Sequence, residues 1–282
     1  MDAITQGSIA STVASAIKED VGGGDITAQL IPQNAIAEAE LVCREDAVIA
    51  GQAWAAAVFA AIDPRVILDW QIPEGGRAQP DSLILICRGS ARSILTAERT
   101  AMNFLQTLSA TATATADLTQ KIQHTEATLL DTRKTLPGLR LAQKYAVKLG
   151  GGENHRIGLF DAFLIKENHI MAAGGIGAAI TAARILSPAQ RIEVEVENLK
   201  ELAVAIEHQP DWIMLDNFSL ADLKTAVQLT PATIMLEASG GIETTTDLIA
   251  IAETGVNYIS MGALTKHCRA IDLSLRVKKI SG

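Results

Sequence analysis

The stretch RIEVEVENLKELAVAIEHQPDWIMLDNFSLADLKTAVQLTPATIMLEASGGI, residues 191–242, decides the fold class of this chain. It contains three short apolar runs, at 191–197, 211–216 and 233–239, which are separated by longer segments of helical character. Apolar runs of this length that alternate with helical segments predict parallel strands covered by helices on both faces. We therefore expect a parallel βα barrel or an open parallel sheet.

The same alternation continues on both sides of this stretch. Strand-like runs occur earlier at 127–131 (ATLLD) and 162–166 (AFLIK), and later at 257–261 (NYISM). The later intervals each have room for one strand and one helix. The second half of the chain is thus predicted to be one repeated βα architecture.

The region from Ala35 to about Ile94 has a different pattern. Short β-rich runs such as AELVCRED, VILDWQI and SLILICRG are separated by Gly, Pro and Asp residues. This pattern predicts a small sheet-based domain.

A helix is predicted from about Ser93 through Leu108. Its apolar residues recur three or four positions apart on one face, at Ile94, Ala97, Ala101, Leu105 and Leu108. Arg99 lies outside this apolar stripe, so we expect its side chain to point away from the core.

The bulk composition excludes several classes of partner. The chain has 282 residues, 48% of them hydrophobic, and a formal net charge of −8. This balance argues against nucleic acid and against an anionic membrane surface. The N-terminus has no basic start followed by an apolar stretch, and no apolar run approaches the ~18 residues of a membrane span. We expect a cytoplasmic protein.

The cysteines give no sign of a metal site or a disulfide framework. There are three, Cys43, Cys87 and Cys268, an odd number with wide spacing and no CxxC pair. We interpret them as reduced packing residues.

Reactive residues follow the apolar runs at the positions where the predicted strands end. In βα barrels the active site gathers at the carboxyl ends of the strands, so we expect these side chains to converge. They are Asp131, Thr132, Arg133, Lys134, Lys166, Glu195, Glu197, Asp216, Ser239 and, with Met261, Gly262.

Many candidate site residues are basic although the chain is acidic overall. Arginine presents a planar fork that suits carboxylate or phosphate, so a cluster of such groups predicts a polyanionic substrate. The cluster comprises Arg99, Arg133, Lys134, His155, Arg156 and Lys166. We interpret Arg140, Lys144 and Lys148, four residues apart in a predicted helix, as an exposed face instead.

Glu195 and Asp216 end neighbouring predicted strands. Paired acids near phosphates hold magnesium, its waters or ribose hydroxyls. Glu193, Glu195 and Glu197 share one strand face by their period of two. Burying three carboxylates together is costly, so not all three are functional, and the alternation alone does not select one.

Glycines after the last two strands indicate a phosphate site. Ser239-Gly240-Gly241 and Gly262-Ala263 stand where barrels bind phosphate through backbone N–H groups. The run Gly150–Gly152 lacks the context of a dinucleotide fingerprint, and no GxxxxGK[ST] motif exists. The sequence therefore indicates neither NAD nor ATP.

Nearly the whole chain resembles the quinolinate phosphoribosyltransferase family. The matching segments are EDVGGGDIT (19–27), ERTAMNFLQTLS (98–109), DTRKTLPGLR (131–140), KYAVKLGGGENHRIGLFDAFLIKENHI (144–170), VEVEN (194–198), MLDNF (214–218), EASGGI (237–242) and ISMGALTK (259–266). One departure is SATATAT, with Ala110 and Thr111, where the family usually has SGIAT; we expect only a packing change there.

The resemblance implies a type II phosphoribosyltransferase fold of class α/β. An N-terminal α/β sandwich-like domain, 1–110, joined by the C-terminal segment 270–282, is expected to precede an incomplete, seven-stranded α/β barrel at 111–269. It also implies a homodimer whose active sites take residues from both subunits.

The resemblance further implies transfer of the phosphoribosyl group of phosphoribosyl pyrophosphate to quinolinate with loss of CO2, a step of NAD biosynthesis. The implied quinolinate ligands are Arg99, Arg133, His155, Arg156 and Lys166, with Arg99 reaching into the partner subunit, and Thr132 is a further implied substrate-binding residue. Lys134 would contact the phosphoribosyl substrate near its pyrophosphate. Glu195 and Asp216 would serve the ribose hydroxyls and Mg²⁺, directly or through water, and Ser239, Gly240 and Gly262 the 5′-phosphate. Lys134, Lys166, Glu195 and Asp216 form the implied catalytic set.

Three alternatives were weighed against this interpretation. A molybdenum-transport-associated paralogue of the same fold would lack Arg99, Lys166 and the LDN strand end, all of which are present. A non-catalytic anion-binding module would leave Glu195 and Asp216 without a role. A Schiff-base aldolase using Lys166 would not need the surrounding arginines.

Overall fold

The computed structural model describes residues 3–242 and 244–281, and the chain forms two compact units. The first comprises Met1–Ala116, Thr135–Gly151 and Thr265–Gly282, and the second comprises Asp117–Lys134 and Gly152–Leu264. Each unit is described by itself.

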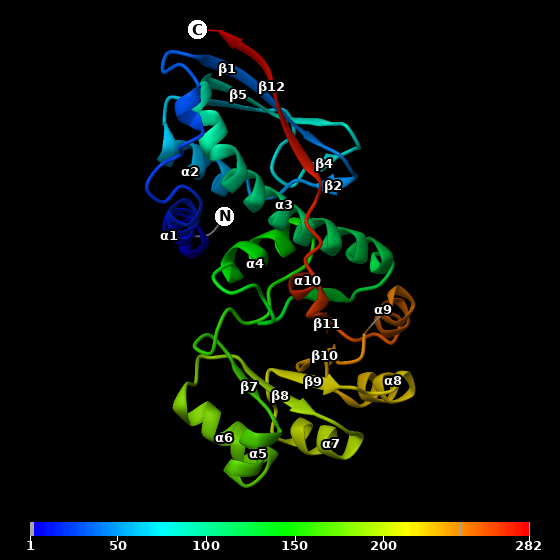
Figure 1. The fold of residues 1–282 in the computed structure, drawn as a ribbon. Coiled ribbons are helices and arrows are strands. Elements are labelled where there is room, and N and C mark those ends of the chain that lie inside the picture. The colour runs from blue at the N-terminus through cyan, green and yellow to red at the C-terminus, as the bar shows by residue number, and fades with distance from the viewer. Residues whose placement is uncertain (1–2, 243, 282) are drawn as a thin grey trace. The chain divides into compact units, whose positions relative to one another are not determined.

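The first unit is built on an antiparallel sheet with the strand order β12-β1-β5-β3. The strands are β1 (Ile36–Cys43), β3 (Ile67–Trp70), β5 (Leu83–Ser90) and β12 (Leu273–Ser281). The three β-rich runs of the first hundred residues are confirmed as strands. Figure 1 shows β12, from the end of the chain, beside β1, and the register runs from Ile36 opposite Ser281 to Cys43 opposite Leu273.

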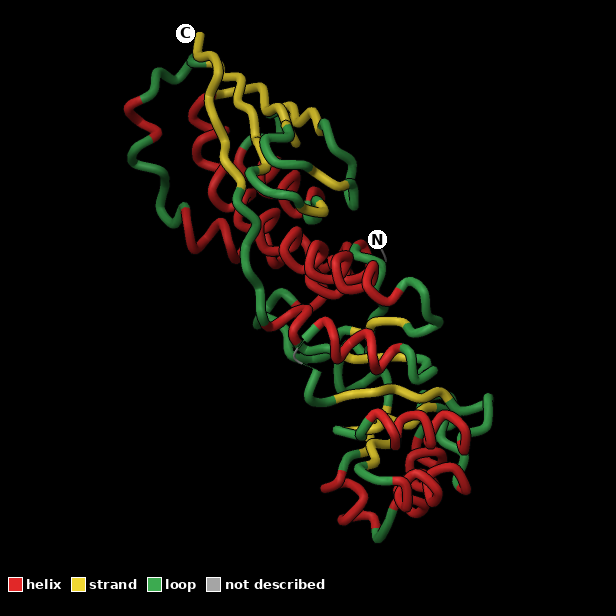
Figure 2. The backbone as a smooth tube through the Cα atoms, turned by 90° about the vertical axis from the view of Figure 1, so that its right-hand side faces the viewer, coloured by secondary structure: helices red, strands yellow, loops and turns green. Residues whose placement is uncertain are grey.

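Helices pack against this sheet around one apolar core. They are α1 (Ala3–Asp20), α2 (Gln52–Ile62), α3 (Ala91–Ile122) and α4 (Arg140–Leu149), with a short 3₁₀ turn, η1 (Ala28–Leu30), and the small ribbon β2 (Ala47–Val48) and β4 (Arg77–Ala78). Figure 2 shows the yellow strands of the sheet running alongside one another with red helices next to them. Alternate residues of β1 are buried, as a sheet with one covered face requires.

Helix α3 is longer than the sequence pattern predicts. All five residues of its predicted apolar stripe are buried and Arg99 is exposed, as expected. The predicted end near Leu108 is wrong, because the helix continues to Ile122. Thr113 and Thr115 donate their hydroxyls to the carbonyls of Ser109 and Thr111, so these weak helix formers are accommodated within the helix.

The predicted exposed face of α4 is also wrong at Lys144. Lys148 is exposed and Arg140 is partly buried, but Lys144 is only 1% exposed. A spacing of four aligns residues along a helix without saying whether tertiary contacts cover them.

The second unit is a parallel α/β sheet with the strand order β6-β11-β10-β9-β8-β7. The strands are β6 (Thr128–Leu130), β7 (Phe163–Ile165), β8 (Ile192–Val196), β9 (Trp212–Asp216), β10 (Met235–Ser239) and β11 (Tyr258–Ser260). The helices are α5 (Glu167–Ala173), α6 (Ile176–Leu186), α7 (Leu199–Glu207), α8 (Leu220–Leu229), α9 (Thr245–Ala252) and α10 (Ala263–Lys266). The alternating α/β pattern predicted for this half is confirmed.

Seven strands were expected, and six are regular in the part of the chain that the structure describes. A single parallel bridge joins Leu130 to Glu153 beyond the β6 edge. The N–H of Glu153 donates to the carbonyl of Leu129 at 2.8 Å, and its carbonyl accepts from Asp131 at 3.2 Å. The seventh position is thus a single bridged residue.

Side chains alternate across the strands of this sheet. Ile192, Val194 and Val196 of β8 are buried, and β8 contacts α6 and α7. Glu193 and Glu195 take the opposite face. This face is the one that carries the chemistry described below.

Across residues 3–242 and 244–281, no single helix is both long and apolar enough to cross a membrane. The bent pair α5 and α6 meets that criterion together, by length and composition only.

Candidate active site

A cavity of about 420 Å³ opens in the second unit, where the carboxyl ends of its strands meet. It is lined by Thr132, Arg133, Lys134, His155, Arg156, Leu164, Lys166, Glu195, Met214, Asp216, Glu237, Ser239, Gly240 and Ser260. All of the site residues implied by the family resemblance except Arg99 and Gly262 are in this lining, whereas Asp131, Glu197 and Met261, which were also expected to converge, are not. The strand ends therefore converge as the pattern of charges indicated.

Gly262 lies against one wall of the cavity without being part of its lining. A Cβ atom added at Gly262 would be 2.8 Å from Cδ of Lys134 and 3.5 Å from the hydroxyl of Thr132. The Thr132 hydroxyl accepts the N–H of Lys134 at 3.0 Å. Only a residue without a side chain leaves Lys134 in this place.

The turn after β10 combines a serine, two glycines and a neighbouring asparagine. Gly240 and Gly241 have φ values of 87° and 63°, and Asn217, after β9, has φ 56°. A Cβ at Gly240 would lie 2.3 Å from an oxygen of Asn217, so no side chain fits. The Ser260 hydroxyl donates to that of Ser239 at 3.1 Å. The result is an open, glycine-lined cradle of the kind that accepts phosphate oxygens.

Carboxylates stand at the ends of β8 and β9. Glu195 is 14% exposed and its Oε2 contacts Nζ of Lys166. Asp216 accepts the side-chain amide of Asn217 at 2.9 Å. Adjacent strands present these two acids at the same edge, and oxygen donors of this type suit Mg²⁺ or its bound waters. The residues present therefore fit a magnesium ion.

Two arginines, Arg133 and Arg156, contribute to the positive charge of the cavity together with Lys134 and Lys166. Burial lowers the pKa of the Arg156 guanidinium, and the charge of nearby Arg133 lowers it further. Crowding of cations in a partly buried pocket favours an anion between them. Arg156 Nη1 also lies 3.5 Å from the carbonyl of Ala162.

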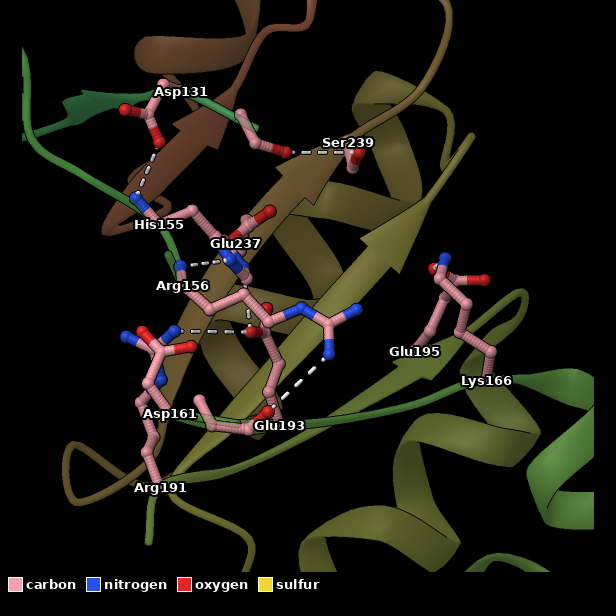
Figure 3. Close-up of polar contacts among 12 residues, drawn as sticks. Asp131, His155, Arg156, Asp161, Lys166, Arg191, Glu193, Glu195, Glu237 and Ser239 are labelled. Carbon is pink, nitrogen blue, oxygen red and sulfur yellow. Dashed lines mark hydrogen bonds and ion pairs between the residues drawn. The ribbon is translucent and has the colours of Figure 1, made fainter. Parts of the chain in front are cut away.

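His155 is held in a buried cluster of acids beneath the cavity (Figure 3). Its Nε2 lies 2.8 Å from Glu193 and 3.2 Å from Glu237, and its Nδ1 accepts the N–H of Arg156 at 2.7 Å. Burial lowers the pKa of His155, but the two carboxylates outweigh this and raise it to about 9. Burial, and then the charge of Glu193, raises the pKa of Glu237 to about 7.

An aromatic layer lies below this cluster. Trp212 stacks on Tyr258 with ring centroids 4.2 Å apart and meets the His155 ring edge-on at 6.3 Å. The Arg191 guanidinium lies 4.1 Å from the centroid of Trp212, with Nη2 3.8 Å from Glu193. In the sheet register Trp212 is the partner of Glu193 and Tyr258 is the partner of Glu237, so these aromatic side chains lie beside the two acids.

Arg99 belongs to the other compact unit. It lies on α3, where its side chain is exposed. Its predicted contact with substrate stays a prediction, as do the roles of the other site residues.

The sequence analysis missed Leu164, Met214, Glu237 and Ser260 as cavity residues. A signal was present for all four: each stands two residues before a predicted site residue and so shares its strand face. Nothing in the sequence showed that Glu237 contacts His155, because an acid within an apolar run does not indicate its partner.

Both parts of the chain match one family. Residues 25–109 match Quinolinate phosphoribosyl transferase, N-terminal domain, and residues 111–276 match Quinolinate phosphoribosyl transferase, C-terminal domain. The chain is 40% identical over 273 residues to a nicotinate-nucleotide pyrophosphorylase (carboxylating) of Mycobacterium leprae, covering 94% of this chain and 95% of that protein. It is 37% identical over 283 residues to quinolinate phosphoribosyltransferase (decarboxylating) 2, mitochondrial, of Nicotiana glauca, covering 93% and 80%.

A solved structure gives the same result. The nicotinate-nucleotide pyrophosphorylase from Francisella tularensis superimposes with a TM-score of 0.94 at 48% identity, and the match covers 96% of each chain.

Proposed function

The chain belongs to the quinolinate phosphoribosyltransferase family, and we propose that its reaction takes place in the cavity of the second unit. The enzyme transfers the phosphoribosyl group of phosphoribosyl pyrophosphate to quinolinate with decarboxylation, in NAD biosynthesis. The products are nicotinate mononucleotide, pyrophosphate and CO2. The observation that carries the assignment to this cavity is that guanidinium groups, a carboxylate pair and a Ser–Gly turn line one space of about 420 Å³.

Quinolinate takes the basic part of the cavity. Arg133 and Arg156 have planar forks that pair with its two carboxylates, and Thr132 and Lys166 add donors. The depressed pKa of Arg156 supports this placement, since a dianion relieves the repulsion between Arg156 and Arg133. His155 contributes from the floor, and Arg99 completes the clamp from a partner subunit.

Phosphoribosyl pyrophosphate takes the remaining walls. Ser239, Gly240 and Gly262 hold the 5′-phosphate, because their turns leave room for backbone N–H groups to approach it. Lys134 lies beside Gly262 and takes the pyrophosphate. Glu195 and Asp216 hold the ribose hydroxyls.

Glu195 and Asp216 would also hold Mg²⁺, either directly or through water. When bound, the ion supplies charge neutralisation for the departing pyrophosphate. Lys166 contacts Glu195 in the described structure, so the lysine and the acid would separate as the substrates enter.

The chain's own residues then orient the reaction. The clamped carboxylates aim the pyridine nitrogen at ribose C1, which gains oxocarbenium character as pyrophosphate leaves beside Lys134. The quaternised ring is electron-poor, so the bond from C2 to its carboxylate breaks with the electron pair left on C2. CO2 departs, and C2 takes a proton to give nicotinate mononucleotide.

The assembly follows from the same assignment. Arg99 is exposed on α3, where it is available to a second copy of the chain. We infer a homodimer with shared active sites, and a cytoplasmic location.

Turnover by the purified protein tests the function. Quinolinate, phosphoribosyl pyrophosphate and Mg²⁺ are expected to yield nicotinate mononucleotide and CO2 in equal amounts, with nicotinate as the control substrate. Lys166→Ala should lose the activity by about 100-fold or more. Lys224→Ala, the same change at an exposed position of α8, should keep it.

Tight binding of quinolinate without any product would contradict the assignment. That result would leave an anion-binding module on this fold.

A further inference from the structure

The cluster of His155, Glu193 and Glu237 is costly to bury. Glu193 and Glu237 are both 0% exposed and His155 is 6% exposed. Two carboxylates in a protein interior require compensation, and a well-packed apolar core would be cheaper. The strand ends above carry the substrate ligands, so these deeper acids need a reason of their own.

The three residues come from three separate elements. His155 lies in the segment between α4 and β7, Glu193 on β8 and Glu237 on β10. The contacts of 2.8 Å and 3.2 Å to Nε2 tie that segment to two strands of the sheet. The imidazole therefore has its position set by two strands of the sheet.

The other ring nitrogen of His155, Nδ1, contacts the backbone of Arg156, a residue of the cavity lining. Nδ1 of His155 accepts the N–H of Arg156, and Oδ1 of Asp131 accepts the N–H of His155 at 3.0 Å. Two successive backbone N–H groups are thereby held by side chains. The guanidinium that follows directly is the one assigned to a quinolinate carboxylate.

A metal ion does not explain the cluster. Ligands bonded to a tetrahedral Zn²⁺ at ~2.0–2.1 Å stand about 3.4 Å apart. The 2.8 Å between Nε2 and Glu193 is a direct contact and leaves no room for an ion between the two atoms.

We propose that Glu193 and Glu237 are positioning residues for quinolinate: they fix the His155 ring from below so that its Nδ1 sets the backbone, and through it the direction, of Arg156. The proposal rests on the proposed function for the identity of the ligand. In this role both acids act through His155, although Glu237 also lines the cavity.

The test replaces both acids with an apolar side chain of similar size. The double variant Glu193→Met/Glu237→Met removes two buried charges, so its melting temperature should stay near or above that of the wild type. Its Kd for quinolinate, measured by titration calorimetry, should rise about tenfold or more, because Arg156 loses its fixed direction. The Kd for phosphoribosyl pyrophosphate should rise much less, because Glu237 reaches the Ser239 turn only through the Ser260 hydroxyl.

Conservative and matched variants separate positioning from packing. Glu193→Gln/Glu237→Gln keeps acceptors for Nε2 and should recover most of the quinolinate affinity. Ile213→Val removes a methyl group from the buried helix-facing side of β9; it should lower the melting temperature and leave both Kd values alone. Glu207→Gln, at an exposed site on α7, should change nothing.

A ¹⁵N-histidine spectrum gives a second readout. The His155 ring in the wild type should carry its proton on Nε2 with Nδ1 as an acceptor, and the Met double variant should lose this fixed tautomer. The His155→Asn spectrum assigns the signal. Should the double variant not fold, the same spectrum and the quinolinate Kd of the single variant Glu237→Met decide.

The outcomes distinguish this proposal from the proposed function. Wild-type quinolinate affinity in a folded Met double variant would overturn the positioning role, as would equal losses for quinolinate and phosphoribosyl pyrophosphate. Absence of turnover by the wild type would instead remove the proposed function, while the binding measurements would still test positioning.

Discussion

Glu237 and His155, in the interior of the second unit, have environments that shift their protonation. Burial and Glu193 raise the pKa of Glu237 from 4.5 to about 7, so the folded state holds a proton there that the unfolded chain releases. At His155 the carboxylates favour a proton on Nε2, while Nδ1 accepts the Arg156 N–H and so disfavours a second ring proton.

Stability should therefore fall as the pH rises. The contribution of Glu237 is fully present below pH 4.5 and is lost as the pH rises through about 7. Unfolding should release about one proton in the range pH 5–7. Chemical denaturation at several pH values measures this, and Glu237→Gln should flatten the slope. Parallel curves for both proteins would contradict the assignment to Glu237.

Helices α3 and α4 of the first unit approach each other closely at Gly150. A Cβ at Gly150, after α4, would lie 2.5 Å from the carbonyl of Ala112 and 2.6 Å from Cβ of Thr115 on α3. The φ of Gly150 is −78°, which any residue could adopt, so backbone conformation does not require a glycine here. The close approach of α3 does. The glycine run 150–152 thus has at least one packing role.

Gly150→Ala should lower the free energy of unfolding by about 1–3 kcal/mol, because backbone atoms of α3 cannot yield easily. Urea denaturation measures the loss. Gly23→Ala is the control, since nothing lies within 4 Å of its Cβ position. Equal stabilities for the two variants would show that α3 and α4 adjust freely.

The turn after β10 makes a separate prediction. Gly240→Ala places a side chain into Asn217 and should raise the KM for phosphoribosyl pyrophosphate about tenfold, on top of a strain cost of about 1–2 kcal/mol. Gly255→Ala carries a similar φ, 94°, with only an ordinary contact to Val227. Gly255→Ala should therefore have a lower melting temperature but an unchanged KM for phosphoribosyl pyrophosphate. A raised KM in both variants would assign the effect to backbone strain alone.

The whole assembly is tested by complementation between subunits. Arg99→Ala and Lys166→Ala should each be nearly inactive. If each site takes Arg99 from one subunit and Lys166 from the other, half of the dimers in a re-equilibrated equal mixture are mixed and have one intact site of two. Activity should then recover to about a quarter of the wild type. No recovery on mixing, with dimers present by ultracentrifugation, would place both residues in sites within one chain.

The sequence by itself determined the α/β class and the convergence of the site. Strands that run parallel end at the same edge, so the side chains at the ends of β6, β7, β8 and β9, Thr132, Lys166, Glu195 and Asp216 among them, converge on one cavity. The apolar stripe of α3 and the exposure of Arg99 followed from helical periodicity in the same way. Local period and chain direction are encoded residue by residue, which is why these features could be predicted.

Only the tertiary structure decided which charges are buried. Glu193 and Glu195 are equivalent by their period of two, yet Glu193 is closed off beneath His155 while Glu195 lines the cavity. Lys144 has the spacing of an exposed face and is buried. Burial and protonation depend on what other elements place against a side chain, and those contacts join residues far apart in the chain.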